Sequence, residues 1–338
     1  MLVNICFKFI ENASGGGNQF LKALRDSFNE KGIYTDDPSN ADIILFNSYQ
    51  EHKQVLNNYK KYYNKIFVHR VDGLTMLYNH KYDLRDKITL FLNKMIADGS
   101  IYQSKWCYKK YLESGMDCDN QYEIIINAPN ENLFYAKTNF NEPSINKIKI
   151  VATSWSSNKR KGFSLYEYLD NKLDFDKFDF TFVGNSPIKF RNINHVQPVN
   201  SEKLSEILKD HHIYITASEN DACSNSLLEA IHCGLYPIAL NDGGHPEIIS
   251  YTNGCLFEGE NDVINKLNQA YEHIKDKKEV SHNLPLIDDI TTQYINFFKK
   301  IIYCSNKNVS LTYRLKAILK INFVTLVERI IRKLNIYG

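Results

Sequence analysis

The sequence predicts an α/β protein that consists of two doubly wound, parallel-sheet domains in series. Its 338 residues and its hydrophobic fraction of 43% suit two cores of ordinary size rather than one small domain. Short runs of β-forming residues alternate with segments of helical periodicity, which is the order that produces βαβ units. A polar segment interrupts this alternation once, and the same alternation then begins again.

The first half of the chain alternates in this way from residue 2 to residue 126. The expected strands are Leu2–Phe9, Asp42–Phe46, Lys65–Val68, Ser100–Gln103 and Glu123–Ile126. The expected helices are Phe20–Glu30, Glu51–Tyr62, Leu84–Met95 and Lys105–Glu113. We therefore expect a first domain over residues 1–140.

The polar segment Ala136–Asn146 has no periodicity and contains a proline, as interdomain linkers commonly do. The strands expected after it are Lys147–Ala152, Phe178–Val183, Ile213–Ala217 and Tyr236–Leu240. The expected helices are Phe163–Leu169, Glu202–Lys209, Asn225–Cys233 and Asp262–Lys275. These elements predict a second domain over residues 146–287. Because open parallel sheets bind ligands at the carboxyl ends of their strands, we expect the functional site in a cleft between the two domains.

Composition and charge exclude several classes of protein. Lysine and arginine total 41 against 39 acidic residues, and a net charge of +2 gives no general attraction for nucleic acid. The seven cysteines are scattered and include no C-x-x-C, so neither a disulfide framework nor a zinc site is expected. The sequence shows no signal peptide and no apolar run long enough to cross a bilayer, which predicts a cytoplasmic protein.

The C-terminal stretch differs in character from the rest of the chain. It predicts a helical appendage over residues 304–338, in which basic and apolar residues are interleaved from residue 310 onward. On a helical wheel the apolar residues share one face and Arg329, Arg332 and Lys333 lie opposite; the apolar set is Phe323, Leu326, Val327, Ile330, Ile331 and Leu334. Such a helix could lie on an anionic membrane and hold the protein peripherally on the inner face. The alternative is a helix that packs on its own domain or on a second subunit.

The segment Ser218–Glu247 consists of a polar loop, a helix, a strand and a second, glycine-bearing loop. Ser224 or Ser226 can cap the helix, whose first N–H groups would then form a site for a phosphate. Asp221 and Glu229 place two carboxylates around the same helix start, where they could accept hydrogen bonds from ligand hydroxyls. The alternative is a capping box made by Ser226 and Glu229, with Asp221 as a turn residue. The second loop, Asn241–Glu247, opens at the same edge of the sheet and favours a pocket.

A basic run follows the first strand of the second domain. Lys159, Arg160 and Lys161 would reach the same carboxyl edge, where fixed positive charges could neutralise a diphosphate. A solvated run of surface charge is the alternative.

Two features of the first domain could also contact a ligand. Residues Asn12–Asn18 contain three glycines between a strand and a helix, so the backbone could approach a ligand closely there. The loop is not a dinucleotide fingerprint, because Phe20 stands where the third glycine should be, and this disfavours a dehydrogenase. His69, at the end of another strand, could donate to a substrate hydroxyl or could be a buried structural histidine.

Taken in their order along the chain, these sequence segments resemble those of the retaining nucleotide-sugar glycosyltransferases of glycosyltransferase family 4, whose GT-B fold has two Rossmann-like domains. The resemblance extends from Leu2 to about Ile302. It is most specific in the acid pair with Glu229–Gly234 and in Gly243–Glu247. Further matching pieces are Gly15–Gly17, Ala97–Trp106, Ile126–Ala128, Arg160–Gly162 and Phe182–Gly184. The resemblance also implies that a last core helix, about residues 288–303, returns to the first domain.

The resemblance implies roles for individual residues. Glu229 would hold the nucleotide ribose, and Arg160 and Lys161 the diphosphate. The backbone N–H groups of Ser224 and Asn225 would bind the distal phosphate. The donor would also lie against the backbone at three glycines, Gly16, Gly17 and Gly184. Asp221 would touch the transferred sugar; it stands where the family's E-x₇-E pair has a glutamate and is one methylene shorter.

The implied activity is transfer, with retention, of a sugar from a UDP- or GDP-sugar to a hydroxyl of a glycan, glycolipid or protein. Neither a metal nor another cofactor is implied, and polysaccharide or lipopolysaccharide synthesis is the implied setting. The residues leave two alternatives open. One is a nucleotide-sugar epimerase of the same fold, and the other is a non-catalytic nucleotide-sugar binding protein.

Overall fold

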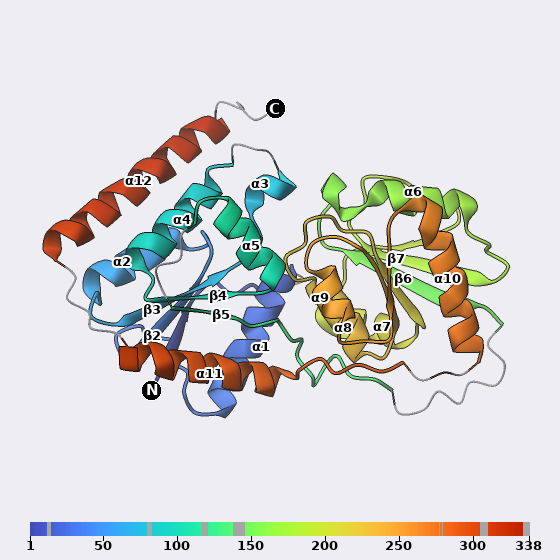
Figure 1. Ribbon diagram of the computed structural model, residues 1–338, viewed down its shortest axis with the longest axis horizontal. Coiled ribbons are helices and arrows are strands. Elements are labelled where there is room, and N and C mark those ends of the chain that lie inside the picture. Colours follow the sequence, from blue (N-terminus) through green and yellow to red (C-terminus); the bar gives the residue numbers. More distant parts are fainter. Residues whose placement is uncertain are drawn as a thin grey trace. The chain divides into compact units, whose positions relative to one another are not determined.

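The computed structural model of the protein describes residues 1–11, 15–79, 83–116, 121–137, 146–276, 278, 280–304 and 310–333. The chain forms two compact units. The first comprises Met1–Phe9, Leu24–Ile126 and Asp288–Gly338, and the second comprises Ile10–Ala23 and Asn127–Ile287. In each unit helices lie on both faces of a parallel sheet (Figure 1).

The first unit has a five-stranded parallel sheet whose spatial order, β1-β2-β3-β4-β5, follows the chain. The strands are β1 (Val3–Cys6), β2 (Ile43–Asn47), β3 (Ile66–Val71), β4 (Gly99–Tyr102) and β5 (Gln121–Ile124). The first four are completely buried, because helices cover both faces. Helix α1 (Gly16–Glu30) belongs to this unit from Leu24 onward, and its first residues belong to the second unit. The other helices of this unit are α2 (His52–Lys61), α3 (Thr75–Tyr78), α4 (Arg85–Ile96), α5 (Lys105–Glu113), α11 (Ile287–Cys304) and α12 (Leu311–Lys333).

Helix α11 follows the second unit in the chain and packs on the sheet of the first unit. A Cβ atom added at Gly99 of β4 would lie 2.6 Å from a side-chain carbon of Ile301, so the helix and the strand are in close contact. Phe298 packs on Phe28 of α1, with ring centroids 6.1 Å apart. Lys31 forms an ion pair with Asp288 near the start of the helix. The chain therefore completes its first unit with its last core helix.

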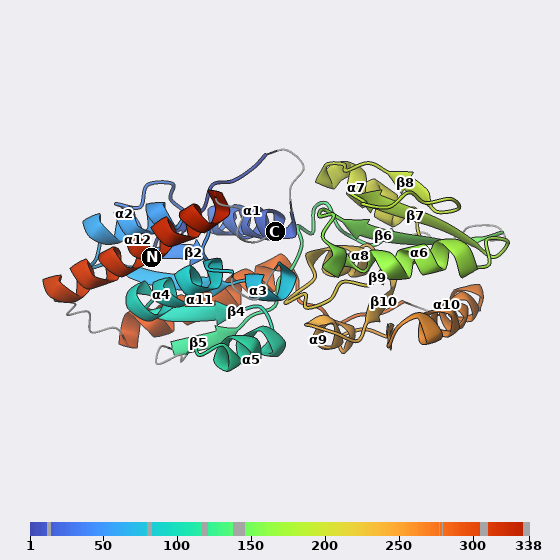
Figure 2. The ribbon, with the colours of Figure 1, turned by 90° about the horizontal axis from the view of Figure 1, so that it is seen from above.

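The second unit has a six-stranded parallel sheet in the order β11-β10-β9-β6-β7-β8. The strands are β6 (Ile148–Ser154), β7 (Phe178–Gly184), β8 (Asn194–Val196), β9 (Ile213–Thr216), β10 (Tyr236–Leu240) and β11 (Cys255–Phe257). The helices are the 3₁₀ turn η1 (Lys159–Lys161), α6 (Phe163–Lys172), α7 (Ser201–Lys209), α8 (Asn225–His232), α9 (His245–Ile249) and α10 (Glu260–Lys275). Figure 2 shows this unit with α6 and α10 labelled beside its sheet.

The strand order places a topological switch point beside β6. Strands β7 and β8 follow β6 on one side, and β9, β10 and β11 continue on the other. Open α/β sheets bind their ligands at the carboxyl edge beside such a switch point, so the loops after β6 and β9 are the candidates for a ligand site.

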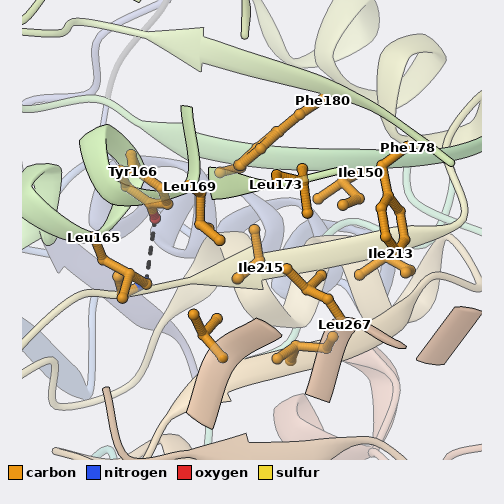
Figure 3. Packing of buried hydrophobic residues seen from close by; sticks show 14 of the residues in the cluster. Ile150, Leu165, Tyr166, Leu169, Leu173, Phe178, Phe180, Ile213, Ile215 and Leu267 are labelled. Atoms are coloured by element: carbon orange, nitrogen blue, oxygen red, sulfur yellow. Dashed lines mark hydrogen bonds between the residues drawn. The ribbon is translucent and has the colours of Figure 1, made fainter. Parts of the chain in front are cut away.

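The core of this unit lies between the sheet and two helices. Figure 3 shows Ile150, Phe180, Ile213 and Ile215 of the strands pointing toward Leu169 and Leu267. The Tyr166 hydroxyl accepts a hydrogen bond of 3.2 Å from the Ala217 amide, so α6 is also tied to the end of β9. This tie positions the chain immediately before the loop that carries Asp221.

The expected α/β architecture is confirmed, with differences at the edges. Strands β8 and β11 were not predicted; each has three residues and lies at an edge of the sheet. The expected strand Leu2–Phe9 ends at Cys6. Residues 138–145 of the expected linker lie outside the described residues.

Two expectations from the sequence concern the cysteines and membrane-spanning segments. The described cysteines are all free thiols, and Cys118 lies outside the described residues. Among the helices of the described ranges, none is long and apolar enough to span a membrane.

The C-terminal helix packs on the first unit through residues outside its expected apolar face. Ala317 and Ile321 of α12 are completely buried, and Ile321 belongs to the same apolar cluster as Leu92 of α4. In contrast, Phe323, Leu326 and Ile330 of the expected apolar face are exposed, so the residues that pack on the first unit come from another side of the helix. The wheel drawn from residues 323–334 missed this difference because apolar residues occur on two sides of α12. Leu334 lies outside the described residues.

Candidate functional site

Three loops meet at the carboxyl edge of the second sheet, after β6, β9 and β10. The Glu219 amide donates to the Arg160 carbonyl oxygen at 2.7 Å. The Gly244 amide donates to the Asp221 carbonyl oxygen at 2.7 Å, and the Asn220 amide donates to the Asp242 carboxylate. Hydrogen bonds therefore join the three loops to one another.

Two of the three cations of η1 are each paired with a carboxylate of the β9 loop. Arg160 pairs with Glu219, and Lys161 Nζ lies 3.2 Å from Asp221 Oδ2. The Lys161 and Asp221 side chains are 22% and 15% exposed, so this pair is partly withdrawn from water. Arg160 and Lys161 are therefore not part of a freely solvated run of surface charge.

Lys161 also keeps Asp221 ionised. Burial alone would raise the pKa of Asp221, but the positive charge of Lys161, the nearby His245 and a hydrogen bond from Lys161 together hold that pKa below its usual value. A carboxylate that stays ionised accepts hydrogen bonds and does not donate a proton. Asp221 is therefore suited to accept hydrogen bonds from hydroxyl groups.

Glycines make the turns beside these charges possible. Gly162 has φ = 78°, and a Cβ atom there would lie 2.4 Å from the Ala217 carbonyl oxygen. Gly184, at the end of β7, has φ = 124°, and its Cβ would lie 1.9 Å from the Ser154 carbonyl oxygen. Only glycine fits either position. Gly184 therefore has a structural role that the sequence did not show, whether or not its backbone also contacts a ligand.

Helix α8 begins at this edge with Ser224 as its N-cap. The Ser224 Oγ accepts a hydrogen bond from the Leu227 amide, and Asn225 is the first helical residue. Ser226 thus lies inside the helix, so the alternative of a capping box from Ser226 to Glu229 is wrong. Ser224 and Asn225 contribute backbone amides at the positive end of the helix dipole.

Glu229 lies in the second turn of α8 and is 7% exposed. Burial raises the pKa of Glu229 to about 8. Among the residues that the structure describes, no side chain or amide donates a hydrogen bond to its carboxyl group. A buried carboxyl without donors is costly, so Glu229 is a candidate partner for the hydroxyl groups of a ligand.

The glycine loop also reaches α8. Residues 10–23 cluster with the second unit, and a Cβ atom at Gly16 would lie 2.6 Å from the Cβ atom of Asn225. Asn127 donates to the Asn225 side-chain oxygen at 3.0 Å. Gly17 has open space, since a Cβ atom added there would have no atom of the described residues within 4 Å. Residues 12–14 of this loop lie outside the described residues.

His69 belongs to β3 of the first unit and is completely buried. Its Nδ1 lies 3.0 Å from the Asn93 amide nitrogen, and its ring stacks on Phe46 with centroids 4.4 Å apart. Burial lowers the pKa of His69 to about 3, so it is neutral near pH 7. These contacts match the structural alternative, and we do not assign His69 to the site.

Three further residues have contacts at the site that the sequence did not predict. Glu219 pairs with Arg160, and Asp242 accepts from the loop that carries Asp221. His245 is completely buried, its Nδ1 bonds to the Leu240 carbonyl oxygen at 3.0 Å, and burial lowers its pKa. Arg160 and Glu219 are 59 positions apart, so no local pattern in the sequence indicates their pairing. Within the described ranges, no three histidine, cysteine or carboxylate side chains form a group that could hold a metal ion.

Part of the second unit matches a known protein family. Residues 190–284 match the family model of glycosyl transferases group 1, a region that contains Asp221 and Glu229. No curated protein sequence matches the chain significantly.

Solved structures share the fold over most of the chain. Sucrose-phosphate synthase from Thermosynechococcus elongatus is 15% identical, with a TM-score of 0.68, over 90% of this chain and 100% of that chain. HepE from Anabaena, in complex with UDP-glucose, is 12% identical, with a TM-score of 0.63, over 90% and 99%. AviGT4, a glycosyltransferase of avilamycin A biosynthesis, is 9% identical, with a TM-score of 0.61, over 90% and 98%. The protein therefore has the GT-B fold of these glycosyltransferases.

Proposed function

We propose that the protein is a retaining glycosyltransferase that moves a sugar from a UDP- or GDP-sugar to a hydroxyl of a glycan or glycolipid. The observation that carries this proposal is the cluster of Arg160, Lys161, Asp221 and the start of α8 at the switch point of the second sheet. The GT-B fold and the match to group 1 glycosyl transferases support it. A solved structure with the same fold binds UDP-glucose, which favours a donor of this class.

The donor would bind along the carboxyl edge of the second sheet. Arg160 and Lys161 would neutralise the diphosphate, and the amides of Ser224 and Asn225 would bind its distal phosphate. Glu229, which has no donor in the described structure, would accept hydrogen bonds from the ribose hydroxyls. Asp221 would accept from a hydroxyl of the sugar. Gly16 and Gly17 would leave room for the donor beside α8.

The chemical step follows from the charges. As the bond between the anomeric carbon and the phosphate oxygen breaks, negative charge grows on the departing diphosphate. Arg160, Lys161 and the dipole of α8 stabilise that charge, so we propose that no metal is required. The departing phosphate oxygen can take the proton of the acceptor hydroxyl, which then attacks from the face that the diphosphate leaves. This geometry retains the anomeric configuration.

Asp221 would not serve as the acid in this step. Its lowered pKa keeps it ionised, and its place beside Lys161 fits a residue that orients the sugar. When a diphosphate arrives, Lys161 would share its charge between Asp221 and the phosphate.

A donor screen tests the proposal. We expect one nucleoside diphosphate sugar to raise the melting temperature, because a ligand at 100 times its Kd stabilises the folded state by about 2.7 kcal/mol. The selected donor, incubated with candidate acceptors and EDTA, should give a product with an unchanged anomeric configuration by NMR. An epimer formed from the donor alone would instead indicate an epimerase. Tight binding without turnover across the acceptors would indicate a binding protein.

A further inference from the structure

Helix α12 is fixed on the first unit by one side only. Figure 1 and Figure 2 show it running beside α4, and its buried residues Ala317 and Ile321 belong to that side. The Arg314 guanidinium lies over the Tyr63 ring at 3.6 Å, and the Lys320 ammonium lies over the Phe91 ring at 4.5 Å. These contacts set which way the rest of the helix faces.

The opposite side of α12 carries a continuous row of exposed apolar residues, here called the outer stripe. Its members are Leu311, Leu315, Leu319, Phe323, Leu326 and Ile330, which are between 47% and 69% exposed. Their spacing of four, four, four, three and four residues keeps them on one side of a helix. The row is about 29 Å long, since a helix rises about 1.5 Å per residue. Scattered exposed apolar residues need no explanation, but a straight row of this length does.

Basic residues flank the outer stripe. Helix α12 contains six lysines and arginines and a single acid, Glu328, so its own net charge of +5 exceeds the +2 of the whole chain. As the helical wheel places them, Lys316 and Lys320 lie along one edge of the stripe and Arg329 lies along the other, while Lys333 lies on the same side as the stripe, three residues after Ile330. The chain's excess of positive charge is therefore concentrated around this exposed apolar row.

We propose that the outer stripe of α12 docks on an anionic membrane surface, with the helix lying flat in the interface. The apolar row would enter the boundary between headgroups and acyl chains, and the flanking cations would contact anionic headgroups. Charge complementarity selects this occupant over a second copy of the chain, whose own α12 would bring a like charge of +5. The inference goes beyond the proposed function and does not depend on it.

Vesicle flotation of the full chain tests the proposal without any donor or acceptor. We expect binding to vesicles of phosphatidylcholine with phosphatidylglycerol, and little binding to vesicles of phosphatidylcholine alone. Replacing two stripe residues, Leu319→Ser with Phe323→Ser, should lower the partition coefficient at least about tenfold. The charge variant Lys316→Glu with Lys333→Glu should lower it by a similar factor and remove most of its dependence on salt.

A matched control uses apolar residues that are exposed on other elements. Leu112→Ser with Tyr251→Ser changes two such side chains, 42% and 43% exposed, and should leave the partition coefficient unchanged. Melting temperatures of all variants should stay near that of the parent, because none of the replaced side chains is buried. Equal binding by the parent and the stripe variant would overturn the proposal. So would a concentration-dependent dimer that the stripe variant abolishes, since a second copy would then cover the stripe.

Discussion

Both sheets of the protein end in loops where an arginine pairs with an acid, but water reaches the two pairs to different extents. In the first unit Arg70 is completely buried and Asp72 is 27% exposed, with Nη1 and Oδ1 2.7 Å apart. In the second unit Arg160 and Glu219 are 43% and 40% exposed. A buried pair is costly to separate, whereas an exposed pair exchanges partners at little cost. The Arg70–Asp72 pair at the first edge should therefore stay intact, whereas Arg160 at the second edge can exchange Glu219 for a ligand.

The topology of the two sheets parallels this difference. Strands β1 to β5 follow one another in space, so neighbouring loops leave the first sheet without a reversal between β1 and β5. Asn47, Asp72 and Gln103, which follow three adjacent strands, bond to one another around Arg70. In the second sheet the reversal lies beside β6, and the charged side chains of the β6 and β9 loops pair with one another at that switch point, where open α/β sheets bind their ligands.

Breaking the buried pair should give the largest effect. Arg70→Met leaves Asp72 without its cation and should lower the free energy of unfolding by about 3 to 5 kcal/mol. Arg160→Met breaks the exposed pair and should cost about 1 kcal/mol or less. Urea unfolding of both variants measures the difference. Equal costs would mean that the two edges do not differ in the way described.

Lys161→Ala, at the second edge, should change activity more than stability, whereas Arg70→Met at the first edge should change stability. The loss of one preorganised charge at the departing diphosphate should lower kcat/KM by a factor equivalent to about 2 to 4 kcal/mol. Lys159→Ala is the matched control, because Lys159 precedes the two paired cations in the same run and is exposed. Steady-state kinetics with the selected donor measure both. A Lys161→Ala enzyme with near-normal kcat/KM would remove this lysine from the site.

Gly115 in the first unit and Gly162 in the second have similar backbone angles. Replacing each by alanine separates the cost of the left-handed conformation from the cost of steric crowding. Gly115 has φ = 84° and open space around a Cβ atom, whereas Gly162 has φ = 78° and lies against Ala217. Gly115→Ala should cost about 1 to 2 kcal/mol for the left-handed conformation alone. Gly162→Ala should cost about 1 to 3 kcal/mol more, because the added methyl is overpacked. Thermal unfolding compares the two variants. Equal decreases in melting temperature would show that the chain after β9 moves away from the added methyl group at little cost.

Glu229→Gln should change how the free energy of unfolding depends on pH. The pKa of Glu229 rises from the ordinary 4.5 to about 8 on folding, so the folded state holds a proton that the unfolded state has lost between these values. The wild-type stability therefore falls with rising pH in that window, by about 1.4 kcal/mol per unit at most. The glutamine variant should lose this slope.

A series of urea titrations from pH 5 to pH 8 measures the slope, with Glu202→Gln on the exposed face of α7 as the control. Parallel stability curves for the parent and Glu229→Gln would contradict the assignment.

The α/β fold was predictable because its central strands are buried on both faces. Such strands appear in the sequence as short apolar runs, for example Ile43–Asn47 and Ile213–Thr216. The edge strands β8 and β11 were not predictable, since half-exposed three-residue strands such as Asn194–Val196 carry too little apolar pattern. Their pairing is set by the neighbouring strand.

The location of the candidate site was predictable, but its pairings were not. Parallel strands send their loops to one edge, so Lys161, Asp221 and Glu229 were expected near one another. Which acid meets which cation depends on the turn at Asn220, whose φ is 55°, and on backbone bonds between loops far apart in sequence. The burial of His69 depends similarly on Asn93 of α4, which a strand pattern cannot show.

The pairing of Arg160 and Lys161 with carboxylates has a consequence for ligand selection. Two positive and two negative side chains leave the resting loops close to electrical balance, so a simple anion such as chloride or inorganic phosphate gains little by approaching. A ligand must compete with Glu219 and Asp221 for Arg160 and Lys161. It must also supply hydroxyl groups that donate hydrogen bonds to these two carboxylates and to Glu229. A molecule that combines phosphates with sugar hydroxyls satisfies both demands, which makes the loops a filter against the abundant small anions of the cell.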